Sequence, residues 1–234
     1  MKNILAVTAC LKRCSIAILY EGVIFEQNLD TDSSANLVSV ADALVHENNV
    51  DLRKIDGVIT ASGPGSFTGI RVSHSFVKGV AFSLGIPAIS VDYFAVVDSM
   101  YNQRCHCAGF LRHSGPTTCV SLNGEGWRCR RDITNGATVT LVLIESDKNH
   151  LYFRHYNNGK YNEGVASYEN IKSYIRNNNI DVIIGNAGEE LGEYHEKMIY
   201  IDDFRNAKYL LSFSELLTPE SKIAPLYISA RSEY

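Results

Sequence analysis

The stretch Gly63-Pro64-Gly65-Ser66-Phe67-Thr68-Gly69-Ile70-Arg71-Val72 joins a short apolar run to a long helical pattern. Residues 57–61 before it read as a buried strand, and apolar residues recur after it at helical spacing as far as Leu84. Gly85 and Pro87 then end the predicted helix. Glycines let a backbone turn sharply or lie close against another surface, and N–H groups at a helix start favour an anion. A loop that cradles a phosphate is therefore the first hypothesis.

The loop lacks what known phosphate loops require. A Walker A loop needs Lys and then Ser or Thr after its last glycine, whereas Ile70 and Arg71 follow Gly69. In the dinucleotide fingerprint Thr68 takes the third glycine position, and a nucleophile elbow around Ser66 would need glycines at positions 64 and 68. The alternative is a glycine loop that packs a helix tightly onto a sheet. Both interpretations stay open on spacing alone.

Length and charge limit the classes of protein. The 234 residues are 45% hydrophobic, enough for one large core or two modest ones. A net charge of −4 and a pI near 6.0 argue against nucleic acid binding across the whole surface, which draws on clustered Lys and Arg. The apolar run at residues 4–7 is too short for a signal peptide, and no later stretch approaches a membrane span. We expect a cytoplasmic protein without membrane contact.

The order of the predicted elements indicates an α/β protein. Three strand-like runs precede a helix at 36–48, the strand before the glycine loop, the long helix and a further strand. This order mixes a hairpin start with parallel crossovers, which predicts one mixed sheet with packed helices. A second set of such patterns begins at residue 139. We divide the chain into an N-terminal lobe of residues 1–101, an irregular insertion or linker at 102–138 and a C-terminal lobe of residues 139–234.

The segment 102–138 is rich in cysteine and arginine. It holds four of the six cysteines, two histidines and five arginines. Cys105 and Cys107 are separated by a single residue and the other two cysteines are isolated, so the paired knuckles of a structural zinc site are missing. Free thiols fit a chain without an export signal. For the basic character of the segment, a solvated loop and a local RNA or partner contact both remain open.

A helix that packs on a sheet needs an apolar arc a little over 100° wide. Two predicted helices carry wider apolar arcs than this. At about 100° per residue, the apolar residues cover roughly 160° of the helix at 36–48 and roughly 180° of the helix at 70–84. The surplus predicts a patch that contacts another chain, with complete burial in the monomer as the alternative. The predicted contact residues are Leu37, Val40, Ala41, Leu44, Ile70, Val77 and Ala81.

No set of residues identifies a catalytic centre. A zinc peptidase helix needs histidines at i and i+4, but Val50 and Ile199 stand four residues after His46 and His195. The carboxylates fall at strand or loop edges, where caps and turns explain them. We therefore predict no catalytic residue, no cofactor and no metal ligand.

The glycine loop and the residues after it resemble the signature of the TsaB family, also called YeaZ. The likeness continues through Lys78-Gly79-Val80-Ala81 and Leu84-Gly85-Ile86-Pro87, and more weakly through Gly185-Asn186-Ala187-Gly188 and Pro225-Leu226-Tyr227-Ile228. The resemblance implies an actin-like (ASKHA) fold of two related lobes. It also assigns the functional loop residues, which are Gly63, Gly65, Thr68, Gly69 and Arg71.

The resemblance further implies a role in making threonylcarbamoyladenosine beside the anticodon of tRNA. In that family the protein is a non-catalytic partner of the TsaD subunit, and its first two helices pair with TsaD or with a second copy. The implied partners are a TsaD-like subunit, a TsaE-like ATPase, a homodimer when the partner is absent, and tRNA only through the complex. Members have also been labelled glycoproteases, so a glycoprotease-like hydrolase is the alternative, followed by a nucleotide-binding protein of the same fold.

The chain departs from the family pattern at several positions. Val7-Thr8-Ala9 stands where the family has Ile-Asp-Thr, so a carboxylate that could organise the metal of a nucleotide is missing. In the second lobe Glu145-Ser146-Asp147 replaces Asp-Ala-Arg. The cysteine-rich, basic segment is an addition of roughly twenty-five residues, for which neither the resemblance nor the usual length of loops offers an account. The sequence is thus similar to a divergent member of the family.

Overall fold

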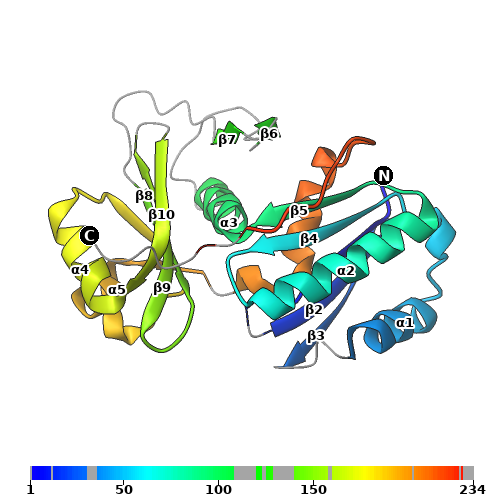
Figure 1. Cartoon of the computed structure of the whole chain (residues 1–234), viewed down its shortest axis with the longest axis horizontal. Coiled ribbons are helices and arrows are strands. Elements are labelled where there is room, and N and C mark those ends of the chain that lie inside the picture. Colours follow the sequence, from blue (N-terminus) through cyan, green and yellow to red (C-terminus); the bar gives the residue numbers. More distant parts are fainter. Residues whose placement is uncertain are drawn as a thin grey trace. The chain divides into compact units, whose positions relative to one another are not determined.

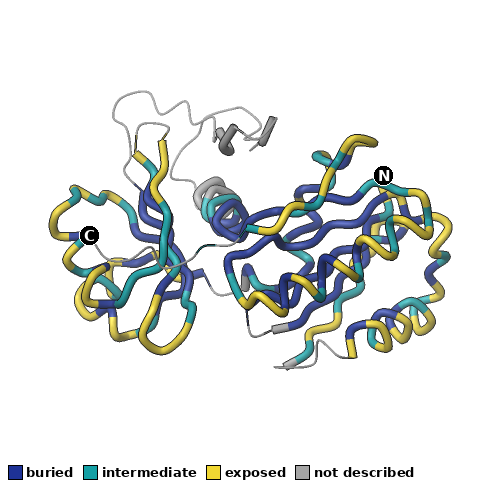
Figure 2. Tube along the Cα trace, in the orientation of Figure 1, coloured by how far each residue is buried: buried dark blue, intermediate teal, exposed yellow. Residues whose placement is uncertain are grey.

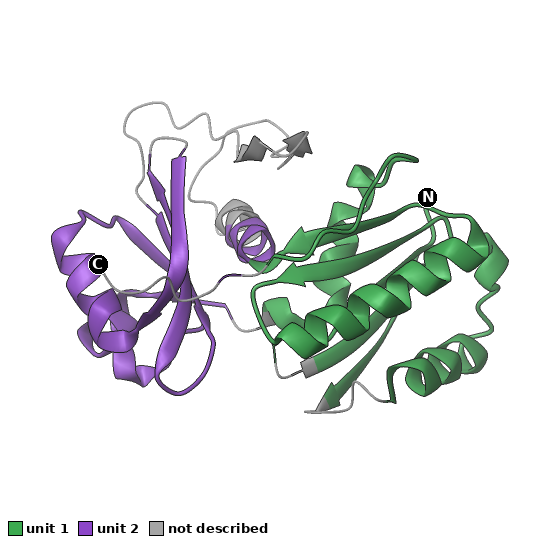
Figure 3. Ribbon diagram, in the orientation of Figure 1, with its two compact units in different colours: residues 1–93, 203–227 green, residues 94–202, 228–234 purple. Residues whose placement is uncertain are grey.

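The computed structural model describes residues 2–11, 13–30, 36–107, 120–122, 125–128, 140–157, 160–201, 203–226 and 228. The chain forms two compact units, which Figure 3 distinguishes by colour. Unit 1 comprises residues 1–93 and 203–227, and unit 2 comprises residues 94–202 and 228–234. No helix among the described residues is long and apolar enough to cross a membrane.

A five-stranded mixed sheet forms the centre of unit 1, with the strand order β3-β2-β1-β4-β5 (Figure 1). Its first three strands form an antiparallel meander, and β4 and β5 then add parallel to β1. The strands are β1 (Ile4–Thr8), β2 (Arg13–Tyr20), β3 (Val23–Asp30), β4 (Gly57–Gly63) and β5 (Ala88–Asp92). The predicted sequence of strands and helices in this part of the chain is confirmed.

Helices α1 (Leu37–Glu47) and α2 (Phe67–Leu84) bury their apolar sides against one face of this sheet. The core beneath them contains Leu5, Val7 and Ile16, whose side chains alternate with those of Ile4 and Ala6 on the other face. Both sets are buried, so β1 reads as a nearly continuous apolar run, and its neighbour β4 is buried along its whole length (Figure 2). The short helical turn η2 (Leu52–Lys54) connects α1 to β4.

The C-terminal part of the chain returns to unit 1. The 3-10 segments η4 (Asp203–Arg205) and η5 (Ala207–Leu216) lie against the sheet, where the Ser15 hydroxyl accepts a hydrogen bond from Ala207 N at 2.8 Å. Further along, Leu226 N donates to Ser62 O at 2.7 Å, and the hydroxyl of Ser90 exchanges hydrogen bonds with Ala224. These contacts explain why the units differ from the lobes that we expected at residues 1–101 and 139–234.

Unit 2 repeats the topology of unit 1. Its sheet has the order β10-β9-β8-β11-β12, again an antiparallel meander followed by two parallel strands. The strands are β8 (Thr140–Glu145), β9 (His150–Asn157), β10 (Lys160–Ser167), β11 (Val182–Gly185) and β12 (Ile199–Tyr200). Helix α4 (Tyr168–Asn177) crosses from β10 to β11 as α1 crosses from β3 to β4. The prediction of two related lobes with mixed sheets and packed helices is confirmed.

The remaining elements of unit 2 are shorter. They are η3 (Glu189–Leu191), α5 (Glu193–Lys197) and the backbone of β6 (Val120–Leu122) and β7 (Glu125–Arg128). Helix α3 (Tyr93–Cys107) follows β5. Most of the predicted insertion at 102–138, including the side chains of its cysteines and histidines, lies outside the described residues.

We expect Ser15→Ala to lower the free energy of unfolding by about 1–3 kcal/mol, because it leaves the Ala207 N–H buried without an acceptor. Urea denaturation followed by circular dichroism measures the change. Ser83→Ala is the control, since its hydroxyl also hydrogen-bonds a backbone group, the carbonyl of Gly79, but is exposed, and we expect a change within about 0.5 kcal/mol. Equal effects of both substitutions would contradict the docking of residues 203–227 on unit 1.

Candidate functional site: the glycine loop and helix α2

The glycine loop runs from the end of β4 into α2, as the sequence predicts. Ser66 caps the helix, its hydroxyl accepting a hydrogen bond from Gly69 N at 3.3 Å, so α2 begins three residues before Ile70. Gly85 ends the helix in the left-handed conformation with φ of 65°. The loop therefore fixes where α2 starts and in which direction it leaves the sheet.

Two of the loop glycines lie in direct contact with the turn after β1. A Cβ on Gly65 would lie 2.2 Å from Cys10 O, and one on Gly69 would lie 1.9 Å from Ala9 O. The φ of Gly65, +154°, also disfavours other residues. Gly63, at the end of β4, lies against the carbonyl of Leu226. The absence of side chains at these glycines thus allows other segments of the protein's own backbone to lie directly against the loop.

These surroundings do not fit a phosphate. The atoms nearest to the glycines are carbonyl oxygens, whose negative ends repel an anion. Ser66 N, which a cradle would offer to a phosphate, donates to Cys10 O at 2.6 Å, and Ile70 N donates to Ser66 O at 2.9 Å. Unit 1 therefore supports the packing interpretation of the loop and not the phosphate cradle.

The end of β1 is equally unsuited to a nucleotide. Thr8, at the position of the missing carboxylate, is fully buried and hydrogen-bonded to the hydroxyl of Tyr93. Tyr93 is itself buried, which raises its pKa well above the ordinary value of a phenol. A neutral, enclosed pair thus occupies the place where a metal-organising group would be needed, so the residues present in unit 1 do not fit a metal-bound nucleotide.

Beneath the loop lies a small set of buried polar groups. Ala61 O receives the Cys10 thiol at a distance of 3.5 Å and lies 3.1 Å from His74 Nε2. Burial raises the pKa of Cys10 and of Cys14 to about 11, so neither thiol supplies a thiolate at neutral pH. Burial also lowers the pKa of His74, helped by the charge of Lys78. These groups are neutral and serve the interior of unit 1.

The predicted partner residues are mostly covered by the sheet of unit 1 itself. Val40 and Ala81 are half-buried. The other five are buried in the core, namely Leu37, Ala41, Leu44, Ile70 and Val77. An apolar arc counted along a helix does not separate sheet contact from partner contact, so the width of the arc does not require a second chain.

Other residues of α2 are the exposed ones. Thr68 and Arg71 are exposed, and the Arg71 guanidinium lies 3.7 Å from the centre of the Phe67 ring. Phe67 is 51% exposed and Phe82 is 91% exposed. Neither phenylalanine is among the predicted contact residues, although at 100° per residue both fall on the side of the helix that carries Arg71. That placement was the available signal.

No group of three or more His, Cys, Asp or Glu residues able to hold a metal ion occurs in the described part of the chain. The side chains of the cysteines and histidines of segment 102–138 lie outside the described part of the chain, so the zinc interpretation of this segment stays a prediction. Glu145 and Asp147 stand where the family carries its Asp-Ala-Arg motif. Glu145 N donates to Asn186 Oδ1, and the Asp147 carboxylate accepts from Asn149 N and His150 N.

Comparisons with known proteins find sequence similarity to proteins that make threonylcarbamoyladenosine in tRNA. The TsaD family model, tRNA N6-adenosine threonylcarbamoyltransferase, matches residues 20–103. The tRNA threonylcarbamoyladenosine biosynthesis protein TsaB of Haemophilus influenzae is 29% identical over 91 residues, 38% of this chain and 39% of that protein. TsaB of Escherichia coli is 25% identical over 157 residues, 66% of this chain and 54% of that protein. The chain thus spans about half or less of the length of these curated relatives.

A solved structure supports the same fold. YeaZ from Pseudomonas aeruginosa superposes with a TM-score of 0.61 at 21% identity, covering 97% of this chain and all of the other. Together with the repeated sheet topology, this likeness shows an α/β fold of two related lobes, the fold of YeaZ. In sequence the chain is similar to TsaB proteins over part of its length and to the TsaD family model over residues 20–103.

We expect Gly69→Ala to lower the free energy of unfolding by about 2–4 kcal/mol, because the new methyl group overlaps backbone that cannot move without shifting β1. Gly79→Ala is the matched control in the same helix. A Cβ at Gly79 meets nothing within 4 Å, so alanine there should add about 0.5–1 kcal/mol of stability. Chemical denaturation of both variants measures the difference, and a tolerated Gly69→Ala would contradict the packing role of the loop.

We expect the stability of the protein to fall as pH is lowered from about 7.5 to about 5.5. His74 and His155 both have pKa values lowered by burial, so the unfolded chain binds more protons than the folded one in this range. The stabilisation is complete above the ordinary histidine pKa of about 6.5 and is lost progressively below it. Urea titrations at several pH values give the free energy of unfolding as a function of pH. This dependence on pH should be weaker for His74→Gln than for the wild type, and an unchanged dependence would refute the role of His74.

Proposed function

We propose that this chain is a non-catalytic scaffold subunit of the complex that makes threonylcarbamoyladenosine in tRNA, and that it acts by pairing with a TsaD-like subunit. The observation that carries the proposal is the packing of the glycine loop against the protein's own backbone. In unit 1 the loop contacts Cys10 O and Ala9 O, and Thr8 stands in place of a carboxylate. The loop therefore orients α2 without holding an anion.

The relatives support the choice of pathway and of partner. Two TsaB proteins are named for threonylcarbamoyladenosine biosynthesis, and the matching family model is that of the transferase itself. That model covers residues 20–103, which include α1, the glycine loop and α2. Similar lobes on two subunits provide surfaces of similar shape, as in an isologous interface. In this proposal the homodimer forms when the partner is absent, a TsaE-like ATPase joins the pair, and tRNA is met through the complex.

The catalytic alternatives lack comparable support. A nucleotide-binding role does not fit the surroundings of the loop in unit 1. No observation on the described residues favours the glycoprotease-like hydrolase, whose nucleophile or metal ligands would have to be found elsewhere.

The proposal is tested by co-expressing the chain with a tagged TsaD-type subunit of the same organism. We expect the two proteins to elute together in size exclusion with light scattering. Each protein expressed alone should elute later, at the mass of its own monomer or homodimer. In cells depleted of their own TsaB, the chain supplied with that TsaD-type subunit should restore threonylcarbamoyladenosine, measured by mass spectrometry of tRNA nucleosides. Separate elution together with failure to restore the modified nucleoside would refute the proposal.

A further inference from the structure

Strand β3 forms one edge of the sheet of unit 1, and no described strand pairs with its outer side (Figure 1). It pairs with β2 at every position of Val23–Asp30 without a bulge. Glu21 and Gly22 join the two strands, and both have positive φ, as in a type I′ hairpin turn. The outer side of β3 is therefore an uninterrupted strand edge.

The hairpin decides which backbone groups of β3 are free. The residues that flank a two-residue turn form a hydrogen-bonded pair, and bonded and non-bonded positions then alternate along an antiparallel pair. Val23 is the first residue of β3 that bonds to β2, and every second residue follows it. The N–H and C=O groups of the even-numbered residues between 24 and 30 consequently point away from the sheet.

The side chains of β3 do not protect this edge. Natural edge strands are blunted by lysine, proline, bulges or a covering segment. Strand β3 contains no lysine, arginine or proline, and Val23 and Ile24 are 53% and 51% exposed. Among its described side chains only Glu26 is charged, and Lys208 Nζ forms an ion pair with it at 3.2 Å. Charge therefore does not keep a second strand away.

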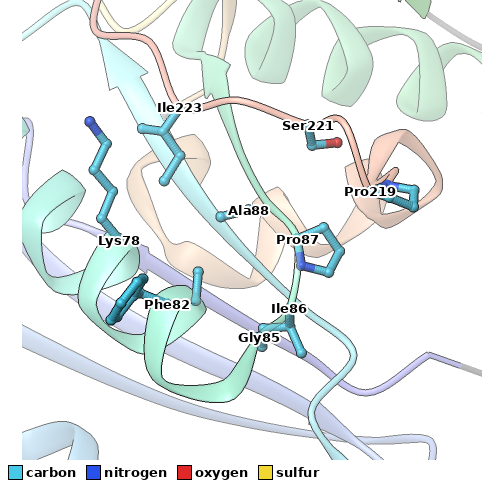
Figure 4. A pocket seen from close by; sticks show the side chains of 10 residues that line it. Lys78, Phe82, Gly85, Ile86, Pro87, Ala88, Pro219, Ser221 and Ile223 are labelled. Atoms are coloured by element: carbon cyan, nitrogen blue, oxygen red, sulfur yellow. The ribbon is translucent and has the colours of Figure 1, made fainter.

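The other edges of the two five-stranded sheets are protected. The Ser90 hydroxyl of β5 exchanges hydrogen bonds with Ala224. The segment that carries Ile223 runs beside β5, with a groove of about 550 Å³ between this segment and helix α2 (Figure 4). In unit 2, β12 has only two residues, and β10 carries Lys160 and Glu163. Of these edges, β3 is the long one without such protection.

We propose that two copies of this chain pair antiparallel through their β3 edges, so that the two sheets of unit 1 become one. With Gln27 opposite Gln27 of the second copy, Ile24 meets Asp30 and Glu26 meets Asn28. Every outward-facing residue of one strand then meets an outward-facing residue of the other, which gives about eight backbone hydrogen bonds. A slip of two residues leaves outward-facing groups without partners, and a slip of one sets core-side residues against the other face.

The side chains suit the same register. Phe25 of one copy lies opposite Leu29 of the other, and both are half-buried at the margin of the apolar core beneath α1 and α2. Pairing therefore extends this core across the junction. The amide of Asn28 can donate to the carboxylate of Glu26 in the opposite strand. The inference goes beyond the proposed function, because β3 contains no residue of the glycine loop or of α2.

The first test places charges on the two-fold axis. Gln27→Glu and Gln27→Lys each set two like charges opposite each other, in a pair whose Cα atoms lie about 4.5 Å apart. We expect each variant alone to dimerise at least about tenfold more weakly than the wild type in sedimentation velocity at low salt. An equimolar mixture of the two variants should recover the dimer. Position 27 is exposed, and circular dichroism checks that both variants are folded.

The second test removes one outward-facing donor. Asn28→Pro deletes an N–H that does not bond to β2, and proline is tolerated in an edge strand at such a position. We expect this variant to be folded and to dimerise at least about tenfold more weakly. Asn28→Thr is the matched control, because it keeps the N–H and favours extended backbone, and it should dimerise within about threefold of the wild type.

Crosslinking tests the register, with the four cysteines of segment 102–138 replaced by serine. Gln27→Cys should form a disulfide between two copies on mild oxidation, because the non-hydrogen-bonded pair has the Cα separation that a disulfide needs. Val23→Cys is equally exposed, but in this register it lies about 27 Å from its copy and should not crosslink. A crosslink at position 23 without one at position 27 would contradict the register and the inference with it.

The outcomes separate this inference from the proposed function. A wild type that stays monomeric at millimolar concentration would overturn the inference. So would a dimer that the Gln27 and Asn28 variants form as well as the wild type, since its interface lies elsewhere. Asn28→Pro should still bind the TsaD-type subunit within about twofold of the wild type, and loss of that binding would also overturn the inference. If the β3 dimer forms but the wild type does not bind the TsaD-type subunit, only the proposed function fails.

Discussion

The fold of unit 1 depends on the contact between the glycine loop and the turn after β1. Gly65 and Gly69 bring two segments more than fifty positions apart within backbone contact, and Ser66 N completes it with a hydrogen bond to Cys10 O. This contact fixes the first turn of α2 against the end of β1. The helix must then run back across β4 and β1, which buries Ile70 and Val77 and leaves its opposite side exposed. The position of the exposed side of α2 is thus a consequence of the loop.

Unit 2 repeats this constraint with different residues. Gly185 ends β11 with φ of +138°, and a Cβ there would lie 1.8 Å from Leu143 O of the neighbouring strand β8. Asn186 N donates to the same carbonyl, and its side chain accepts from Glu145 N. In both units the chain that follows the central parallel strand is held by backbone contacts to other segments of its own unit. The two sheets thus share these backbone contacts after the central parallel strand as well as a strand order.

The sequence predicts most of this architecture because its signals are local. Alternation and helical spacing locate the strands and the two helices of unit 1, and Gly85 marks the end of α2 in the left-handed conformation that it adopts. The return of residues 203–227 to unit 1 was not predictable in this way, since a 3-10 segment such as Ala207–Leu216 has no clear period and its contact with Ser15 is 192 positions distant. Hydrophobic periodicity predicts the secondary structure of a segment but not which distant segment packs against it.

The candidate site shows the same limit at the level of side chains. The loop glycines are compatible with an anion or with a carbonyl oxygen, and only the position of Cys10 and Ala9 decides between the two. For α2, the helical spacing predicts Ile70 and Val77 as partner contacts, whereas both side chains are buried in unit 1. The informative residue is instead Phe82, an apolar side chain on the polar side of the helix. Burial of apolar surface is favourable wherever it occurs, so an apolar arc is satisfied first by the chain's own sheet. An aromatic ring on the side of the helix that faces away from the sheet is not covered by the sheet, so it is a clearer candidate for a contact with another segment or chain than the width of an apolar arc.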